Sequence, residues 1–191
     1  ISSTSISGTT IANSGDISGG AGMAIDVDGG AASLTNASGG TIYGAIDLTD
    51  NADTFANAGT FEAYGTSDFG LGADLLTNTG VVGAERNSGV AGTVTFNGLE
   101  TFNNAGGLVS MADGQVGDRL VLAGTTFNGT GNSRLALDVA LGGPGSTADV
   151  LQITGAGQFT GATTILPTDT LAASPGVLNF GGILVVDSSN A

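Results

Sequence analysis

The sequence predicts an all-β protein, a parallel β-helix, and three observations predict this fold class. One short motif recurs along the first 110 residues at a spacing that drifts slightly. Each copy places a β-rich stretch on either side of an Asn-x-Gly corner. No window shows a sustained apolar period of 3.6 residues, and the 35 glycines disfavour helix.

The recurring motif is an apolar residue, any residue, Asn, a small residue, Gly, any residue and a second apolar residue. Its copies cover residues 11–17, 34–42, 55–61, 76–82 and 102–108, and the copy at 34–42 has two extra residues. Their asparagines are Asn13, Asn36, Asn57, Asn78 and Asn104, so the successive spacings are 23, 21, 21 and 26 residues. Such a drifting period favours stacked coils with connections of variable length.

Each element of the motif has a predicted place in such a coil. The apolar residues are expected to stack inside a narrow core: Phe55, Phe61, Leu76, Val82, Phe102 and Leu108. The five asparagines are expected to form a ladder of side-chain amides along the axis. Asn and Gly both tolerate left-handed backbone angles, which predicts a corner at each pair. A Gly/Ser-rich linker and an antiparallel sandwich are the alternatives.

The pattern changes near residue 115, which predicts a division into residues 1–115 and a C-terminal section, 116–191. Two related segments begin with Asp and end with Gly after alternating apolar positions. They are Asp118–Gly124, with Leu120, and Asp149–Gly155, with Leu151. Further strands are expected at 135–141, 162–166 and 182–186. These longer strands predict a better-buried closing section.

This C-terminal pattern resembles the passenger domains of type Va autotransporters of the pertactin-like kind. The resemblance is found in Asp118–Gly124, Leu135–Val139, Ser146–Gly155 and Gly182–Val186. It implies a right-handed parallel β-helix that is exported through the outer membrane of a Gram-negative bacterium by the protein's own translocator β-barrel. It also implies that the C-terminal section nucleates folding, as an autochaperone. We expect the chain to be a fragment of such a protein.

Composition excludes several classes of function. The 191 residues include no His, no Cys and no Lys. Three arginines and seventeen carboxylates give a net charge of −14. Disulfide scaffolds, zinc sites and catalysis by a thiol or imidazole are therefore excluded. Nucleic acids are not expected as partners, because they are bound through Lys and Arg.

Carboxylates are the candidates for chemistry, and none forms a convincing site. We considered Asp26 with Asp28, then Asp47 with Asp50 and Asp53, and Glu85 beside Arg86. A solvated outer face accounts for them better than a catalytic pair does. The glycine-rich runs at 19–23 and 142–146 lack the Asp of a calcium-binding β-roll repeat. No catalytic residue, cofactor or metal is expected.

The function expected from the sequence is therefore non-enzymatic adhesion at the bacterial surface. The partner would be a host-cell or extracellular-matrix component, or the same protein on a neighbouring bacterium. Loops at residues 19–30 and 66–73 are the expected binding positions. A stalk that presents an upstream functional domain and a carbohydrate-active β-helix enzyme are the two alternatives.

Overall fold

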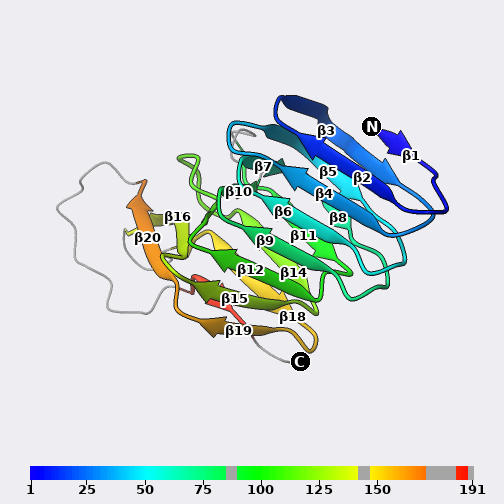
Figure 1. Cartoon of the computed structure of the whole chain (residues 1–191). Coiled ribbons are helices and arrows are strands. Elements are labelled where there is room, and N and C mark those ends of the chain that lie inside the picture. Colours follow the sequence, from blue (N-terminus) through cyan, green and yellow to red (C-terminus); the bar gives the residue numbers. More distant parts are fainter. Residues whose placement is uncertain (85–89, 142–146, 171–183, 189–191) are drawn as a thin grey trace.

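The protein, examined as a computed structural model, consists of β-strands joined by turns and loops (Figure 1). The structure describes residues 1–84, 90–141, 147–170 and 184–188. No helix occurs in these residues, so none of them forms a membrane-spanning helix. Every described strand pair is parallel except β16 (Arg134–Ala140) with β17 (Thr147–Ala148). The prediction of an all-β protein is confirmed, whereas the antiparallel alternative is wrong.

The strands form two sheets, and the smaller sheet is a single row of seven short strands. We call it row one, and it is at the front of Figure 1. Row one contains β2 (Thr9–Asn13), β4 (Ala32–Asn36), β6 (Thr54–Asn57), β9 (Leu75–Asn78), β12 (Thr101–Ala105), β15 (Thr126–Thr130) and β19 (Gln158–Gly161).

The larger sheet contains two rows, which are joined through the long strands β3 (Asp16–Val27) and β5 (Thr41–Asp47). Row two continues from their first halves through β7 (Thr60–Ala63), β10 (Val81–Ala84), β13 (Leu108–Ser110), β16 and β20 (Thr164–Asp169). Row three contains β1 (Ser2–Ser3), the second halves of β3 and β5, β8 (Thr66–Asp68), β11 (Thr93–Asn97), β14 (Arg119–Ala123), β18 (Val150–Thr154) and β21 (Val186–Asp187).

The chain passes through rows one, two and three in the same order, and each pass stacks on the pass before it (Figure 1). We call one such pass a layer. Layers one and two are continuous through β3 and β5, and later layers use a separate strand in each row. The predicted boundary between residues 115 and 116 lies within this stack, because β12 pairs with β15 and β11 with β14 across it.

Alternate residues of each strand point inward and fill the core with apolar columns. The core column of row one is Ile11, Leu34, Phe55, Leu76, Phe102, Phe127 and Phe159. The rings of Phe102 and Phe127 are 5.1 Å apart between centroids in an edge-to-face arrangement. Such aromatic pairs add to the free energy gained by burying apolar area.

Leu108 corrects one predicted core position. It pairs with Val81 on the outer side of row two and is half-buried, whereas Val109 pairs with Val82 and is fully buried. The cause is one extra residue in the corner after Asn104. Gly107, rather than Gly106, occupies the position of Gly80. The Leu108 N–H donates to Gly80 O, and in the next layer the Arg134 N–H donates to Gly107 O in the same way.

The two segments predicted as binding loops are partly strands. Strand β3 extends to Val27, with register shifts between Ser18 and Ile25, and residues 66–68 form β8 in row three. The expected strand at 162–166 begins two residues later, as β20. Of the strand expected at 182–186, residues 182 and 183 lie outside the described part, and Val186 begins β21.

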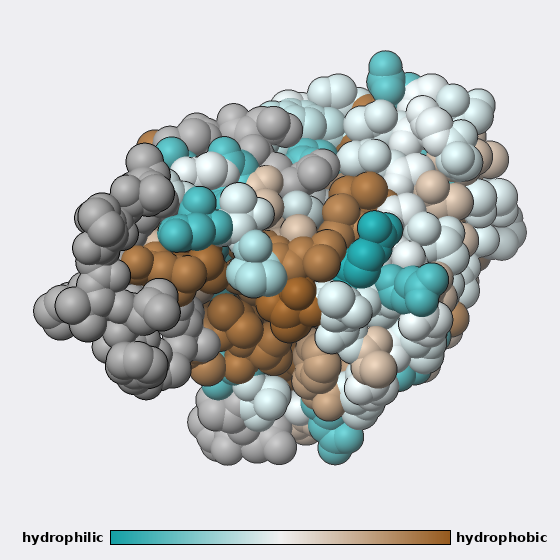
Figure 2. Space-filling view, turned by 90° about the vertical axis from the view of Figure 1, so that its left-hand side faces the viewer, coloured by the Kyte–Doolittle hydropathy of each residue, from teal (hydrophilic) through white to brown (hydrophobic). Residues whose placement is uncertain are grey.

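The outer side of row two is partly apolar. Val81 and Leu108 are half-buried there, and Leu166 is exposed. Figure 2 views the molecule from the left of Figure 1 and shows apolar side chains gathered in one patch. The outer side of row two is therefore more apolar than the outer side of row one, which carries hydroxyl and amide groups.

Space, and not a left-handed angle, requires glycine at Gly59 and Gly80, which corrects the prediction at these two corners. The prediction holds at Gly39 and Gly106, whose φ values are 87° and 83°. None of Gly15, Gly59 and Gly80 has a positive φ. A Cβ atom on Gly80 would lie 2.1 Å from the carbonyl oxygen of Gly59, and one on Gly59 would lie 2.2 Å from that of Gly40. Successive backbones therefore approach too closely for any side chain.

A comparison of two glycines in this column tests the requirement. We expect Gly80→Ala to lower the free energy of unfolding by about 2–3 kcal/mol, because the neighbouring backbone must move. Gly15→Ala is the matched control, since nothing lies within 4 Å of its added Cβ, and its effect should stay below about 1 kcal/mol. Urea titrations of both variants measure the difference, and equal losses would contradict the steric explanation.

Candidate functional site

The five predicted asparagines lie in one buried column at the corner between rows one and two. Asn13 and Asn36 illustrate the contact, in which Nδ2 of one donates to Oδ1 of the next at 2.8 Å. The same 2.8 Å contact joins Asn36 to Asn57, Asn57 to Asn78 and Asn78 to Asn104. Each amide also donates to a backbone carbonyl, as Asn57 Nδ2 does to Val81 O at 2.9 Å. The column thus links side chains to backbone in successive layers.

The column continues beyond Asn104 through hydroxyl groups. Asn104 Nδ2 donates to Ser133 Oγ at 2.8 Å, and Ser133 Oγ lies 2.9 Å from Thr163 Oγ1. Ser133 takes the place of the corner glycine, and Gly129 takes the place of the asparagine. A Cβ on Gly129 would lie 2.1 Å from Thr163 Oγ1, so the exchange of small and polar residues preserves the packing.

A second column, which was not predicted from the sequence, consists of carboxylates at the corner between rows three and one; Asp53 and Asp74 are buried and Glu100 is exposed. Asp53 Oδ1 accepts the N–H of Ala32 at 2.6 Å, and Asp74 Oδ1 accepts the N–H of Asp53 at 2.6 Å. Glu100 Oε2 then accepts the N–H of Asp74 at 2.7 Å. Each carboxylate satisfies a backbone donor of the layer before it, where no strand pairing is available.

A sequence signal for this column exists. The three acids each precede a ladder asparagine by four residues, as Asp53 precedes Asn57. Asp53 also accepts the Thr49 N–H at 2.7 Å and is only 1% exposed. It was considered instead as a solvated or catalytic group, and the structure corrects that interpretation. A recurrent acid at fixed distance from a corner asparagine therefore indicates a structural acceptor.

A third column explains the Asp positions of the autotransporter-like motif. Asp118 Oδ1 accepts the N–H of Gly92 at 2.7 Å, and Asp149 Oδ1 accepts the N–H of Asp118 at 3.0 Å. Asp149 Oδ2 also accepts the N–H of Asp138, and the Asp149 N–H donates to Asp138 O. Asp118 and Asp149 are buried at the corner between rows two and three.

The remaining residues of the motif have equally local roles. Leu120 and Leu151 pair in register and are fully buried in the core. Gly124 and Gly155 end β14 and β18 with φ values of 79° and 64°, which few other residues adopt. The motif therefore describes one side of a layer: a polar corner, an inward apolar strand and a left-handed exit.

Two of the buried carboxyl groups have a raised pKa. Burial raises the pKa of Asp74 to about 6; the Asp53 N–H opposes this shift, and the charges of Asp53 and Glu100 add to it. Burial likewise raises the pKa of Asp149 to about 6 against hydrogen bonds from three backbone N–H groups, and the charge of Asp138 contributes. In both cases folding favours the protonated form.

These raised pKa values predict a protein that loses stability as the pH rises. Asp74 contributes its stabilising effect fully below the unfolded-state value near 4 and loses it as the pH rises through about 6. We expect thermal unfolding to occur several degrees lower at pH 7.5 than at pH 4.5. Asp74→Asn keeps the acceptor oxygen without the charge, so it should reduce this difference and stabilise the chain at pH 7.5.

Asp50→Asn, at an exposed carboxylate, controls for the change in net charge. It should leave the pH dependence of the melting temperature as in the unchanged chain. If the melting temperatures of the unchanged chain and of Asp74→Asn changed equally with pH, this role for Asp74 would be ruled out.

Two of the acids considered for chemistry, Asp26 and Asp47, are half-buried and lie in a line on row three. Asp26, Asp47 and Asp68 pair in register across β3, β5 and β8. Burial, together with Asp68, Asp26 and Asp28, raises the pKa of Asp47. Among the described residues no group of three or more acidic side chains is arranged to hold a metal ion. Glu85 and Arg86 lie outside the described residues.

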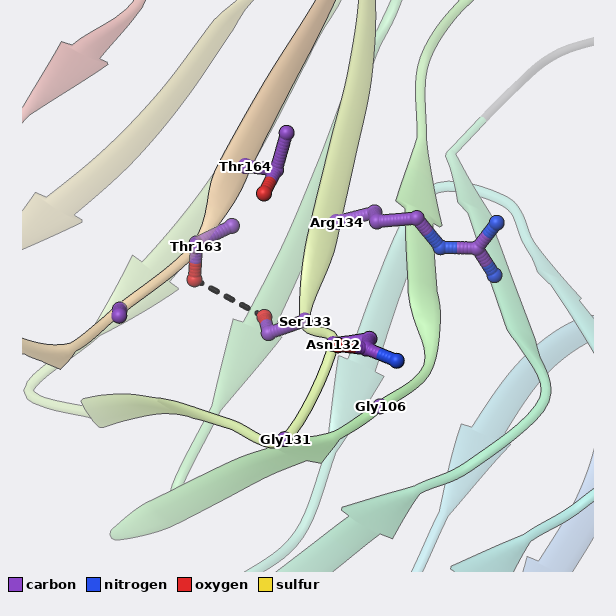
Figure 3. Close-up of a pocket in the computed structure, with 8 residues that line it drawn as sticks. Gly106, Gly131, Asn132, Ser133, Arg134, Thr163 and Thr164 are labelled. Carbon is purple, nitrogen blue, oxygen red and sulfur yellow. Dashed lines mark hydrogen bonds between the residues drawn. The ribbon is translucent and has the colours of Figure 1, made fainter.

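One pocket lies where the asparagine column changes to hydroxyl groups (Figure 3). Its lining is Gly106, Gly131, Asn132, Ser133, Arg134, Ala162, Thr163 and Thr164. Figure 3 shows the Ser133 and Thr163 hydroxyls directed at each other, while the Arg134 guanidinium extends away from them. These groups offer hydrogen bonds and one cation to a ligand, but none of the described residues that line the pocket is a base that could activate the Ser133 hydroxyl.

Comparison with models of protein families, with characterised proteins and with solved structures finds no match to this chain. The resemblance to autotransporter passengers therefore rests on the residues quoted for it. The geometry described above is the basis for a functional assignment.

Proposed function

We propose that the chain is a right-handed parallel β-helix from an autotransporter passenger and acts as a non-enzymatic adhesin on a Gram-negative surface. The observation that supports it most is the stacking of every layer on the one before, with buried polar columns at all three corners. Right-handedness follows from the rule that about 98% of parallel crossover connections are right-handed. Such a stack is a rod with three outer faces.

The outer faces and connections of the rod are the binding surface in this proposal. In the described residues they present hydroxyl, amide and carboxylate groups over a long distance. Many weak contacts along such a surface, multiplied by many copies on a cell, provide avidity. The partner is a host-cell or matrix component, or the same protein on another bacterium.

The C-terminal section, residues 116–191, has a further role in this proposal as the nucleus of folding. Its strands β14, β15 and β16 are in register with β11, β12 and β13 and so present a template for the layer before them. Export through the protein's own translocator β-barrel would deliver this section to the surface as a start for the stack. The adhesive surface and the nucleus are then parts of one stack.

A stalk that presents an upstream domain is the second candidate, because the same rod would support it. Binding by the chain itself separates the two roles. We expect the fluorescently labelled 191-residue chain to bind cultured epithelial cells or immobilised matrix proteins saturably, above a composition-matched acidic control protein. A folded chain that binds no more than the control would leave the stalk as the function of these residues.

A further inference from the structure

The outer side of row one has no charge in a chain that is otherwise strongly acidic. None of the seven strands of row one contains Asp, Glu, Lys or Arg, although the chain has seventeen carboxylates and three arginines. Row three, in contrast, presents Asp26, Asp47 and Asp68 in register. The acidic charge is therefore distributed unevenly around the rod.

Two columns of uncharged side chains, most of them small, cover this outer side. The first is Thr10, Ser33, Thr54, Leu75, Thr101, Thr126 and Gln158, and the second is Ala12, Thr35, Ala56, Thr77, Asn103, Asn128 and Thr160. Neighbours in a column share hydrogen bonds, as Thr54 Oγ1 does with Ser33 Oγ at 3.3 Å and Asn128 with Asn103 at 3.2 Å. The strands pair without a register shift, so the surface is regular.

Parallel sheets are usually covered on both faces, and the described residues cover this one only on its inner face. A covering partner has to tolerate the charge of the rest of the molecule. Two copies with a net charge of −14 each repel one another wherever their acidic sides approach. Row one is the side on which a second copy meets no like charge across the contact.

We propose that the outer side of row one is the contact through which two copies of this chain associate face to face. This inference rests on the proposed adhesive function and names the partner as the chain itself. The contact is isologous, since the same hydroxyl and amide columns face one another on both copies. Hydroxyl and amide side chains both donate and accept hydrogen bonds, so the surface is complementary to itself.

The area of the contact determines its strength. Seven strands at about 4.8 Å spacing and four residues at about 3.3 Å give a face of roughly 400 Å² per copy. That is about half of the roughly 800 Å² that each partner buries in a stable interface. One pair of copies therefore associates weakly, and arrays on two surfaces associate through many pairs.

Clustering of beads coated with the 191-residue chain tests this contact. We expect clustering to increase as salt is raised from about 10 to 150 mM, because the Debye length falls from about 30 to 8 Å and repulsion between the acidic sides is screened. Thr35→Glu with Thr77→Glu, on row one, should reduce clustering at least about tenfold, since like charges then face each other. Thr66→Glu with Thr93→Glu, on row three, adds the same charge and should leave clustering within about twofold.

Charge reversal keeps the test independent of any loss of stability. Beads with Thr35→Lys and Thr77→Lys should cluster with the row-one Glu beads, whereas beads with Thr66→Lys and Thr93→Lys should not. Equal loss in the row-one and row-three Glu variants would overturn the proposal. Dispersed wild-type beads with saturable cell binding would overturn this contact alone, and dispersed beads without cell binding would overturn the adhesive function as well.

Discussion

The structure depends on hydrogen bonding of the backbone groups at the three corners of each layer. Within the rows, N–H and C=O groups pair with the neighbouring strands, but at the corners they are buried without that pairing. Side chains supply the missing partners. They are the asparagine amides at one corner, Asp53 and Asp74 at the second, and Asp118 and Asp149 at the third. Because each side chain bonds to an adjacent layer, its position fixes the stacking of the strands on both sides.

Part of this arrangement could be recognised in the sequence. The asparagine spacing located the corner between rows one and two, and the alternation around Leu120 and Leu151 located two strands of row three. Strand β8 of row three was missed because it has only three residues, of which the inward one is Ser67 rather than an apolar residue. The carboxylate columns were missed because an isolated Asp in a sequence looks like a solvated group; only the stacking shows that it is buried.

The same stacking gives the three faces different chemistry. Inward positions are constrained by the core and the corners, so only outward positions are free to differ between rows. Row three places Asp47 between Asp26 and Asp68, row two exposes Leu166, and row one carries neutral hydroxyl and amide groups. A rod with distinct faces can hold its acidic side toward solvent while another side makes contact, which is the physical basis of the proposed adhesive role.

The most direct test of the central role of the corner columns compares the free energies of unfolding of two variants, Asn57→Ala and Asn103→Ala. Asn57 is buried and bonds to Asn36, Asn78 and Val81, whereas Asn103 is half-buried on the outer side of row one. We predict a loss of about 2–4 kcal/mol for Asn57→Ala, since it leaves buried partners unsatisfied, and less than about 1 kcal/mol for Asn103→Ala. Equal, small losses for both would contradict the account.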